Sequence, residues 1–218
     1  MSDIFDRIES QTGFRIPDLY RRLVADGRTS YGATREEWKQ TWRERSLHDP
    51  PALLIASLHV EWWSPEQIAD YEEPDYWLSE LRLIPFAQNG AGDVWCWHAA
   101  SPGAEIVFAA HDENEAEVVA ADLEGFLLRH MVLGLSEIYP DDGSDFTLEE
   151  RVMSARANVR VLAPYLAPKR VALLEELCSR PLVQDAEWGV CGSCLATRRR
   201  RSSPASSLIP DWARPSST

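Results

Sequence analysis

The chain has 218 residues, a length that suits one ordinary domain with an additional segment. Hydrophobic residues make up 44% and charged residues 26%, a balance typical of a globular protein with a core. No apolar run is long enough to cross a membrane, and the amino terminus lacks the basic start and apolar middle of a secretory signal. We therefore expect a cytoplasmic protein without a membrane role.

The net charge of −13 is unevenly distributed along the chain. Residues 195–218 contain five Arg and one Asp, a net charge of +4, so the first 194 residues carry −17. Such an acidic body repels the phosphate backbone of nucleic acids and speeds encounter with a basic protein. The charge therefore disfavours a nucleic-acid partner and favours a basic protein partner, although solubility alone would explain it equally well.

Three helices are predicted in the amino-terminal quarter. Apolar residues at helical spacing predict a helix over Asp3–Thr12, and Pro17 opens a second helix over Asp18–Asp26. A third begins after Thr34, which is placed to cap it.

The following segment contains a predicted strand and a short helix. Leu53–Val60 is apolar nearly throughout, which is typical of a central strand buried on both faces. Ser64 and Gln67 have the spacing of a capping box around Pro65, so a short helix over Pro65–Tyr71 is expected.

The centre of the sequence predicts an antiparallel meander followed by a helix. Turn residues separate four short apolar runs, Leu81–Phe86, Val94–Trp97, Ile106–Ala110 and Val118–Ala121. Trp95 and Trp97 point to the same strand face, most simply the core. Apolar residues then recur at helical spacing, with Asp122 placed to cap this helix and Gly134 placed to end it.

These central motifs resemble the SUKH superfamily, the Smi/Knr-like domain. The similarity is carried by the runs IPFAQNGAGDVWCW, AEIVFAAHDENE and DLEGFLL, in that order, and it extends over about residues 3 to 135. The resemblance implies a protein-binding domain, either an immunity protein that neutralises a bacterial toxin or a regulatory scaffold.

Beyond the domain, capping and apolar spacing predict helices over Thr147–Tyr165 and Lys169–Arg180. The last segment, from about residue 196, has too few apolar residues to pack and is expected to be disordered. The fold class is therefore α+β, with a mixed or antiparallel sheet of about five or six strands flanked by helices. Its expected parts are a SUKH-like domain (1–138), a helical appendage (139–183) and a tail (184–218).

The strongest candidate for a metal-binding or redox site is the Cys191-Gly192-Ser193-Cys194 motif, which could provide two zinc ligands or a redox pair. Zinc would need two more ligands, and no second such motif is present, so a zinc or redox module is kept only as an alternative. His111 and Asp112 have the residue types of a base and its orienting carboxylate, but no activated nucleophile lies beside them. We expect no catalytic residues, no metal and no cofactor.

The candidate partner-binding residues are aromatic and acidic: Trp62, Trp63, Glu72, Glu73, Asp75, Asp112 and Glu113. An exposed Trp beside acidic loops is a common anchor of protein interfaces, whereas the alternative is that both Trp side chains belong to the core. Four Arg residues, Arg198–Arg201, can contact nucleic acid, but in an acidic protein a solvated end is the simpler interpretation. Together with these residues, the resemblance implies a non-enzymatic immunity protein that covers a basic toxin, with a regulatory scaffold of the same fold as the alternative.

Overall fold

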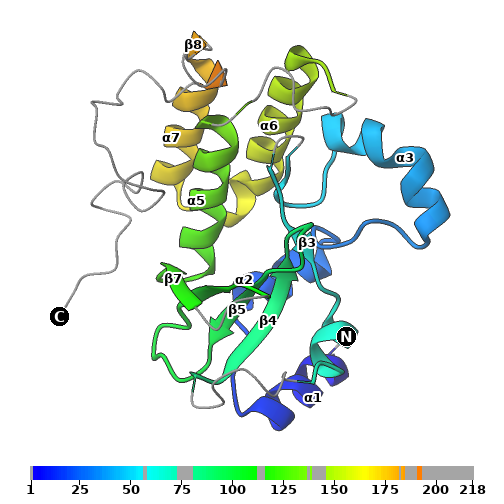
Figure 1. Ribbon diagram of the computed structural model, residues 1–218, viewed down its shortest axis with the longest axis vertical. Helices are drawn as coiled ribbons and strands as arrows, with labels where there is room; N and C mark the ends of the chain where they lie inside the picture. Colours follow the sequence, from blue (N-terminus) through cyan, green and yellow to red (C-terminus); the bar gives the residue numbers. More distant parts are fainter. Residues whose placement is uncertain are drawn as a thin grey trace. The chain divides into compact units, whose positions relative to one another are not determined.

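The computed structural model is shown in Figure 1. The structure describes residues 2–55, 58–72, 81–111, 116–136, 138, 146–181, 183–184 and 191–192. The chain divides into two compact units, and both are discontinuous in sequence. The first contains Met1–Ser30 and Val60–Phe126, and the second contains Tyr31–His59 and Leu127–Thr218.

The first unit is built on a five-stranded antiparallel sheet (Figure 1). Its strands are β3 (Glu61–Trp62), β4 (Leu83–Gln88), β5 (Val94–His98), β6 (Ile106–Ala109) and β7 (Ala116–Ala120). Their spatial order is their order in the sequence, because each strand pairs with the next. The predicted meander and the α+β fold class are confirmed, and the sheet is antiparallel throughout.

Short helices accompany this sheet. They are α1 (Ser2–Thr12), α2 (Asp18–Ala25) and α4 (Pro65–Ala69). The predicted capping box of α4 is present, since Gln67 N donates to Ser64 Oγ at 3.2 Å and Ser64 N donates to Gln67 Oε1 at 2.8 Å. The helix ends two residues before the predicted Tyr71.

Aromatic side chains form the centre of the first unit. Phe86 and Trp97 stack with ring centroids 4.6 Å apart, and the Tyr20 ring lies edge-on to Trp97 at 5.0 Å. Phe126 meets Phe86 at 5.3 Å and Trp95 at 5.7 Å. Trp95 and Trp97 are both buried, as their shared strand face predicted.

Helix α5 (Leu123–Ser136) begins in the first unit and continues into the second. Asp122 caps it as predicted, because its Oδ1 atom accepts a 2.7 Å hydrogen bond from Gly125 N. Gly134 does not end the helix, which corrects the prediction. A Cβ atom at Gly134 would lie 2.5 Å from Ile55 Cδ1, so this glycine permits a close approach within the second unit.

The second unit is mainly helical, with α3 (Arg35–His48), α6 (Leu148–Leu162) and α7 (Pro168–Ser179). A 3₁₀ turn over Ala163–Tyr165 separates the last two. Thr34 and Thr147 cap α3 and α6 as predicted, each accepting a hydrogen bond from the backbone N three residues later. Helices α3 and α6 pack against each other.

The apolar run Leu53–Val60 does not form a central strand of the sheet, which corrects that prediction. It contains β1 (Leu54–Ile55) and β2 (Leu58–His59), two short strands that pair with each other. Leu53 has a φ of 61°, so the backbone turns where a continuous strand would run on. Strand β1, with the buried Ile55, packs against α6 instead, because burial requires an apolar neighbour and not a sheet.

The unit boundaries differ from the continuous parts expected from the sequence, since residues 31–59 group with the carboxy-terminal helices. Near the end of the described chain, β8 (Val183–Gln184) pairs with β9 (Cys191–Gly192). The tail from residue 193, including Arg198–Arg201, lies outside the described residues. Among the helices that the structure describes, none combines the length and apolar character needed to span a membrane.

Candidate partner-binding surface

Trp62 lies in the aromatic core. As part of edge strand β3, it is only 4% exposed, and its ring lies 5.8 Å from Phe86 and 6.2 Å from Tyr20. The ring of Phe126 approaches it edge-on at 6.3 Å. The side chain thus stabilises the first unit and is not displayed to a partner, which removes it from the predicted binding residues.

Trp63 lies on the opposite side of the same chain segment, because successive strand residues point to opposite faces. Its backbone N donates to Phe86 O at 2.9 Å, and its Nε1 atom donates to Gln88 Oε1 at 3.0 Å. The half-buried ring packs against an apolar cluster of the sheet, formed by Leu83, Val94, Cys96, Val107 and Ala109. Trp63 therefore has both a fixed orientation and an accessible part.

Polar and aromatic groups surround the accessible part of Trp63. Gln88 Nε2 donates to Glu61 Oε2 at 2.9 Å, so Glu61, Gln88 and Trp63 form a hydrogen-bonded chain. The ring of Tyr71 lies 5.5 Å from that of Trp63, and the exposed Glu72 follows Tyr71 directly. An aromatic pair with acidic side chains nearby is the type of surface that meets a basic protein.

The other predicted acidic residues cannot be placed on this surface. Glu73 and Asp75 belong to residues 73–80, and Asp112 and Glu113 belong to residues 112–115, all outside the described chain. Of the predicted set, the structure describes Trp62, Trp63 and Glu72: Trp62 lies in the core, and Trp63 contacts Tyr71, which precedes Glu72 in the sequence. Tyr71 was missed, although an aromatic residue between a short helix and an acidic run was a usable signal.

His111 pairs with Asp93, whereas Asp112, the partner that the sequence suggested, lies outside the described residues. The distance from His111 Nδ1 to Asp93 Oδ1 is 2.8 Å, and His111 N donates to the same oxygen at 3.1 Å. A hydrogen bond from the Asn89 side chain, followed by the bonds from His111, lowers the pKa of Asp93. This arrangement joins the turn before β5 to the end of β6, so it is a structural contact between loops.

Metal-ligating groups do not gather in the part of the chain that the structure describes, where no cluster of three or more His, Cys, Asp or Glu is found. Cys191 is described only by its backbone in β9, and Cys194 lies outside the described residues. The zinc or redox alternative therefore remains a hypothesis about the sequence motif.

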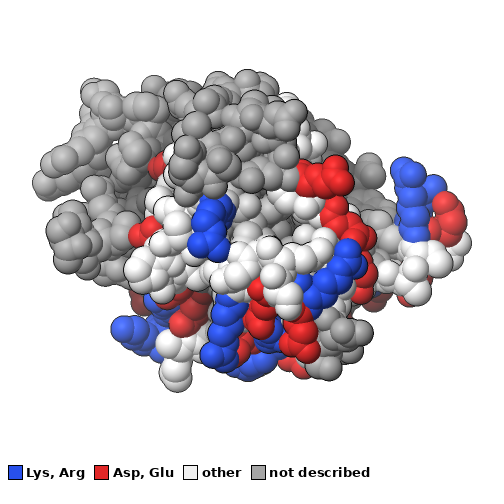
Figure 2. Space-filling model, turned by 90° about the horizontal axis from the view of Figure 1, so that it is seen from below, with Lys and Arg blue, Asp and Glu red and all other residues white. Residues whose placement is uncertain are grey.

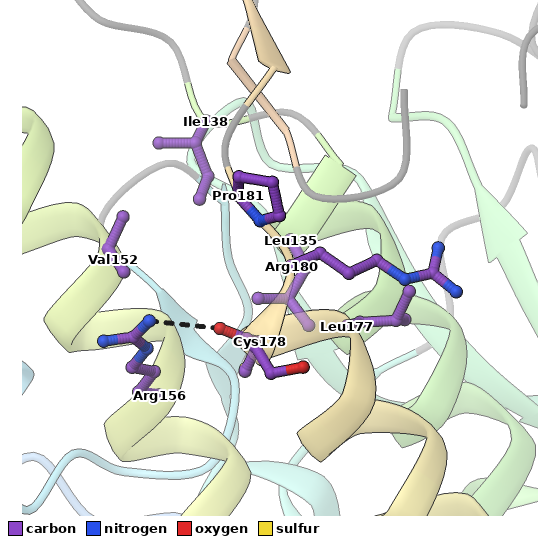
Figure 3. Close-up of a pocket in the computed structure, with 9 residues that line it drawn as sticks. Leu135, Ile138, Val152, Arg156, Leu177, Cys178, Arg180 and Pro181 are labelled. Carbon is purple, nitrogen blue, oxygen red and sulfur yellow. Dashed lines mark hydrogen bonds between the residues drawn. The ribbon is translucent and has the colours of Figure 1, made fainter. Parts of the chain in front are cut away.

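A pocket of about 370 Å³ opens in the second unit beside α6 and α7 (Figure 3). Its walls are largely apolar, and two arginines line it. Arg156 Nη2 donates to the backbone oxygen of Cys178 at 3.1 Å, whereas Arg180 pairs with Glu176 at 2.7 Å. Figure 3 shows Arg180 directed away from Arg156. The two cations therefore do not converge on a ligand, and each has a protein partner.

Charge on the described surface is mixed. Figure 2 shows acidic and basic side chains close to one another on the face that it draws. Several exposed arginines pair with carboxylates of the same chain, for example Arg7 with Asp70 at 2.7 Å and Arg15 with Asp18 at 3.4 Å. On the described surface, part of the acidic charge is therefore neutralised by neighbouring cations.

Comparison with known proteins identifies the domain. The model of the SMI1 / KNR4 family (SUKH-1) matches residues 2–129, more than half of the chain, and includes the whole five-stranded sheet and the first half of α5. No curated protein and no solved structure shows significant similarity to this chain. The matched span and its α+β meander establish that the chain belongs to the SMI1 / KNR4 (SUKH-1) family.

Proposed function

We propose that this chain is an immunity protein, which binds a cognate bacterial toxin and neutralises it by covering its surface. The observation that carries the proposal is the SUKH-1 family match over residues 2–129, because many bacterial members of this superfamily act in this way. The chain acts by binding in this proposal, and it transforms no substrate.

The charge distribution supports a basic toxin as the partner. The first 194 residues carry a net charge of −17, which accelerates encounter with a positively charged protein at low salt. Long-range attraction of this kind mainly raises the association rate. Tight binding needs buried contacts in addition, and these come from aromatic anchors at the interface.

The surface around Trp63 is the proposed anchor. Its ring is held by the hydrogen bond to Gln88 and by the contact with Tyr71, so little side-chain freedom is lost on binding. Glu72 lies next to this pair in sequence, and Glu73 and Asp75 follow it. We therefore propose Trp63 as the central contact and Glu72, Glu73 and Asp75 as the acidic rim, with Asp112 and Glu113 as further acidic contacts.

The proposal is tested with the gene immediately upstream of the gene for this chain. We expect it to encode a modular toxin that arrests growth when expressed alone. Co-expression of this chain should restore growth, and the two purified proteins should form a stable complex. An upstream product that neither arrests growth nor binds this chain would contradict the proposal and favour a regulatory scaffold of the same fold.

A further inference from the structure

Strand β7 forms one edge of the five-stranded sheet (Figure 1). It pairs with β6 on one side. On its other side, no backbone hydrogen bond links residues 116–120 to any other part of the chain that the structure describes. The outer N–H and C=O groups of such an edge can pair with an additional extended segment.

An apolar row runs across the sheet and ends uncovered at this edge. Directly opposed residues on β4 to β7 form the row, namely Pro85, Cys96, Val107 and Val118. The first three are buried, whereas Val118 is 41% exposed. Within the described chain, it is the one large hydrophobic side chain that is exposed. A further strand beside β7 would extend this apolar row and cover Val118.

The charge around β7 indicates which kind of segment would pair with its open edge. Residues 112–124 contain six Asp or Glu residues and no Lys or Arg. Glu117 is exposed and lies directly opposite Phe108, on the sheet face that Val118 does not share. A cation on an incoming strand can therefore pair with Glu117 while the next residue covers Val118. Two copies of this acidic edge would repel each other, which disfavours a second copy of the chain.

We propose that β7 receives an extended segment of a protein partner in which basic and apolar residues alternate. Main-chain hydrogen bonds to the open edge provide the affinity, and the alternation matches Val118 on one face and Glu117 on the other. The inference rests on the proposed function, under which the partner is the toxin. It adds a second contact, distinct from the surface around Trp63.

The first test uses the full chain and a synthetic peptide of about eight residues, within the usual strand length, with alternating Lys and Val. We expect hydrogen exchange of the amides of residues 116–120 to slow when this peptide is added. A peptide of alternating Glu and Val should have no effect. Val118→Lys and Glu117→Lys should each weaken binding by about tenfold or more, because both place a like charge on the edge.

The matched control is Asp6→Lys, which makes the same charge change as Glu117→Lys at an exposed position of α1 and should bind the peptide like the wild type. Circular dichroism checks that each variant is folded. Equal binding by all variants, or slowed exchange only outside residues 116–120, would overturn the proposal.

Two other occupants are distinguished in the same experiment. Protection of β7 that rises with protein concentration would identify a second copy. Protection in the free chain that disappears when Arg198–Arg201 are replaced by Ser would identify the chain's own basic tail. Either result overturns a partner segment as the occupant.

The toxin itself separates the two proposals. If the toxin binds the wild type and Val118→Lys equally and leaves residues 116–120 unprotected, the edge inference fails and the immunity function stands. If the Lys–Val peptide protects β7 but the upstream product does not bind, the immunity function is contradicted, whereas the proposal that β7 binds an extended basic segment is supported.

Discussion

Arg43 and Glu150, 107 positions apart in the sequence, are joined by two hydrogen bonds of 2.8 and 2.9 Å from Arg43 Nη2 to the two carboxylate oxygens. The same carboxylate accepts a 2.8 Å hydrogen bond from Thr147 N, which closes the capping box of α6. The Arg43 guanidinium also lies 5.0 Å from the Phe146 ring centroid, and Trp42 meets that ring edge-on at 5.2 Å. One carboxylate therefore both starts α6 and attaches α3 to it.

Acid should weaken this attachment. The backbone hydrogen bond from Thr147, the Thr147 hydroxyl and Arg43 lower the pKa of Glu150, in that order of importance. A lowered pKa in the folded state means that the unfolded state binds the proton more readily. The contribution of Glu150 to stability is therefore fully present above the ordinary glutamate pKa of about 4.3, and it is lost as the pH falls through the lower folded value.

The Glu150→Gln variant tests this pH dependence, because Gln can still close a capping box but carries no charge. Denaturation midpoints measured between about pH 2.5 and pH 7 should show the wild type more stable above about pH 5 and the two proteins converging in acid. A constant difference at every pH would contradict the titration of Glu150 as its cause.

Gly134→Ala should destabilise the second unit, although alanine favours helix more than glycine by about 1 kcal/mol. The added Cβ would lie 2.5 Å from Cδ1 of Ile55, whose side chain is only 1% exposed. Overpacking of this kind costs about 1–3 kcal/mol, so we expect a net loss of about 0–2 kcal/mol in the free energy of unfolding.

Chemical denaturation of Gly134→Ala, Ile55→Val and the double variant gives the check. Ile55→Val removes Cδ1 and alone should cost about 0.5–1.5 kcal/mol. The double variant should lose less stability than the two single losses added together, because the clashing atom is absent. Simple additivity would show that Ile55 moves aside without cost.

Asn158→Ala should lower the free energy of unfolding by about 1–3 kcal/mol, the cost of leaving a buried polar group without its hydrogen bond. The fully buried Asn158 side chain donates to Leu54 O at 3.0 Å and to Ser154 O at 3.1 Å. Urea denaturation measures the loss. An exposed alanine substitution on the same helix, Glu149→Ala, is the control and should cost far less, and an equal cost for both would contradict the role of the buried amide.

Substitutions of the two adjacent tryptophans should have different effects, one on stability and the other on toxin affinity. Trp62→Ala removes a buried aromatic side chain and should cost about 3–5 kcal/mol of stability. Trp63→Ala removes a half-buried ring and should cost less stability, but it should reduce toxin affinity by about 2 kcal/mol or more if Trp63 is the anchor. Denaturation and calorimetric titration measure the two quantities, and an unchanged toxin affinity for a folded Trp63→Ala would refute the anchor.

Replacing Glu72, Glu73 and Asp75 by Lys should slow association with the toxin and flatten its dependence on salt, because it reverses the local attraction. Stopped-flow measurements over a range of ionic strength give both quantities. The control reverses the same number of charges at Glu36, Glu44 and Glu175 on α3 and α7. An equal effect of both variants would indicate net charge alone, and unchanged kinetics in the first variant would refute this binding surface.

Local signals predicted much of the fold. Thr34, Ser64 and Thr147 each cap a helix through a hydrogen bond to a residue three positions away, so a short stretch of sequence contains the whole interaction. The strands of the meander were also predictable, because turn residues separate short apolar runs and consecutive antiparallel strands tend to pair.

Part of the candidate site was predictable as well. Trp62 and Trp63 were recognised as a pair at a strand end, but the sequence left open whether one of them is exposed or both belong to the core; adjacent residues of a strand point to opposite faces. Which of the two lies in the core depends on the Tyr20, Phe86 and Phe126 rings that surround Trp62, and these come from three distant elements.

By itself, therefore, the sequence determined the helices, the four consecutive strands of the meander, the acidic balance and the family resemblance. Only the tertiary structure decided that Leu53–Val60 forms two short paired strands outside the main sheet, that His111 pairs with Asp93, and that Val118 ends an apolar row at an open edge. The physical reason is the range of the interactions. Caps and turns act over three or four residues, whereas burial of a face depends on which distant element covers it, and an apolar pattern does not specify that element.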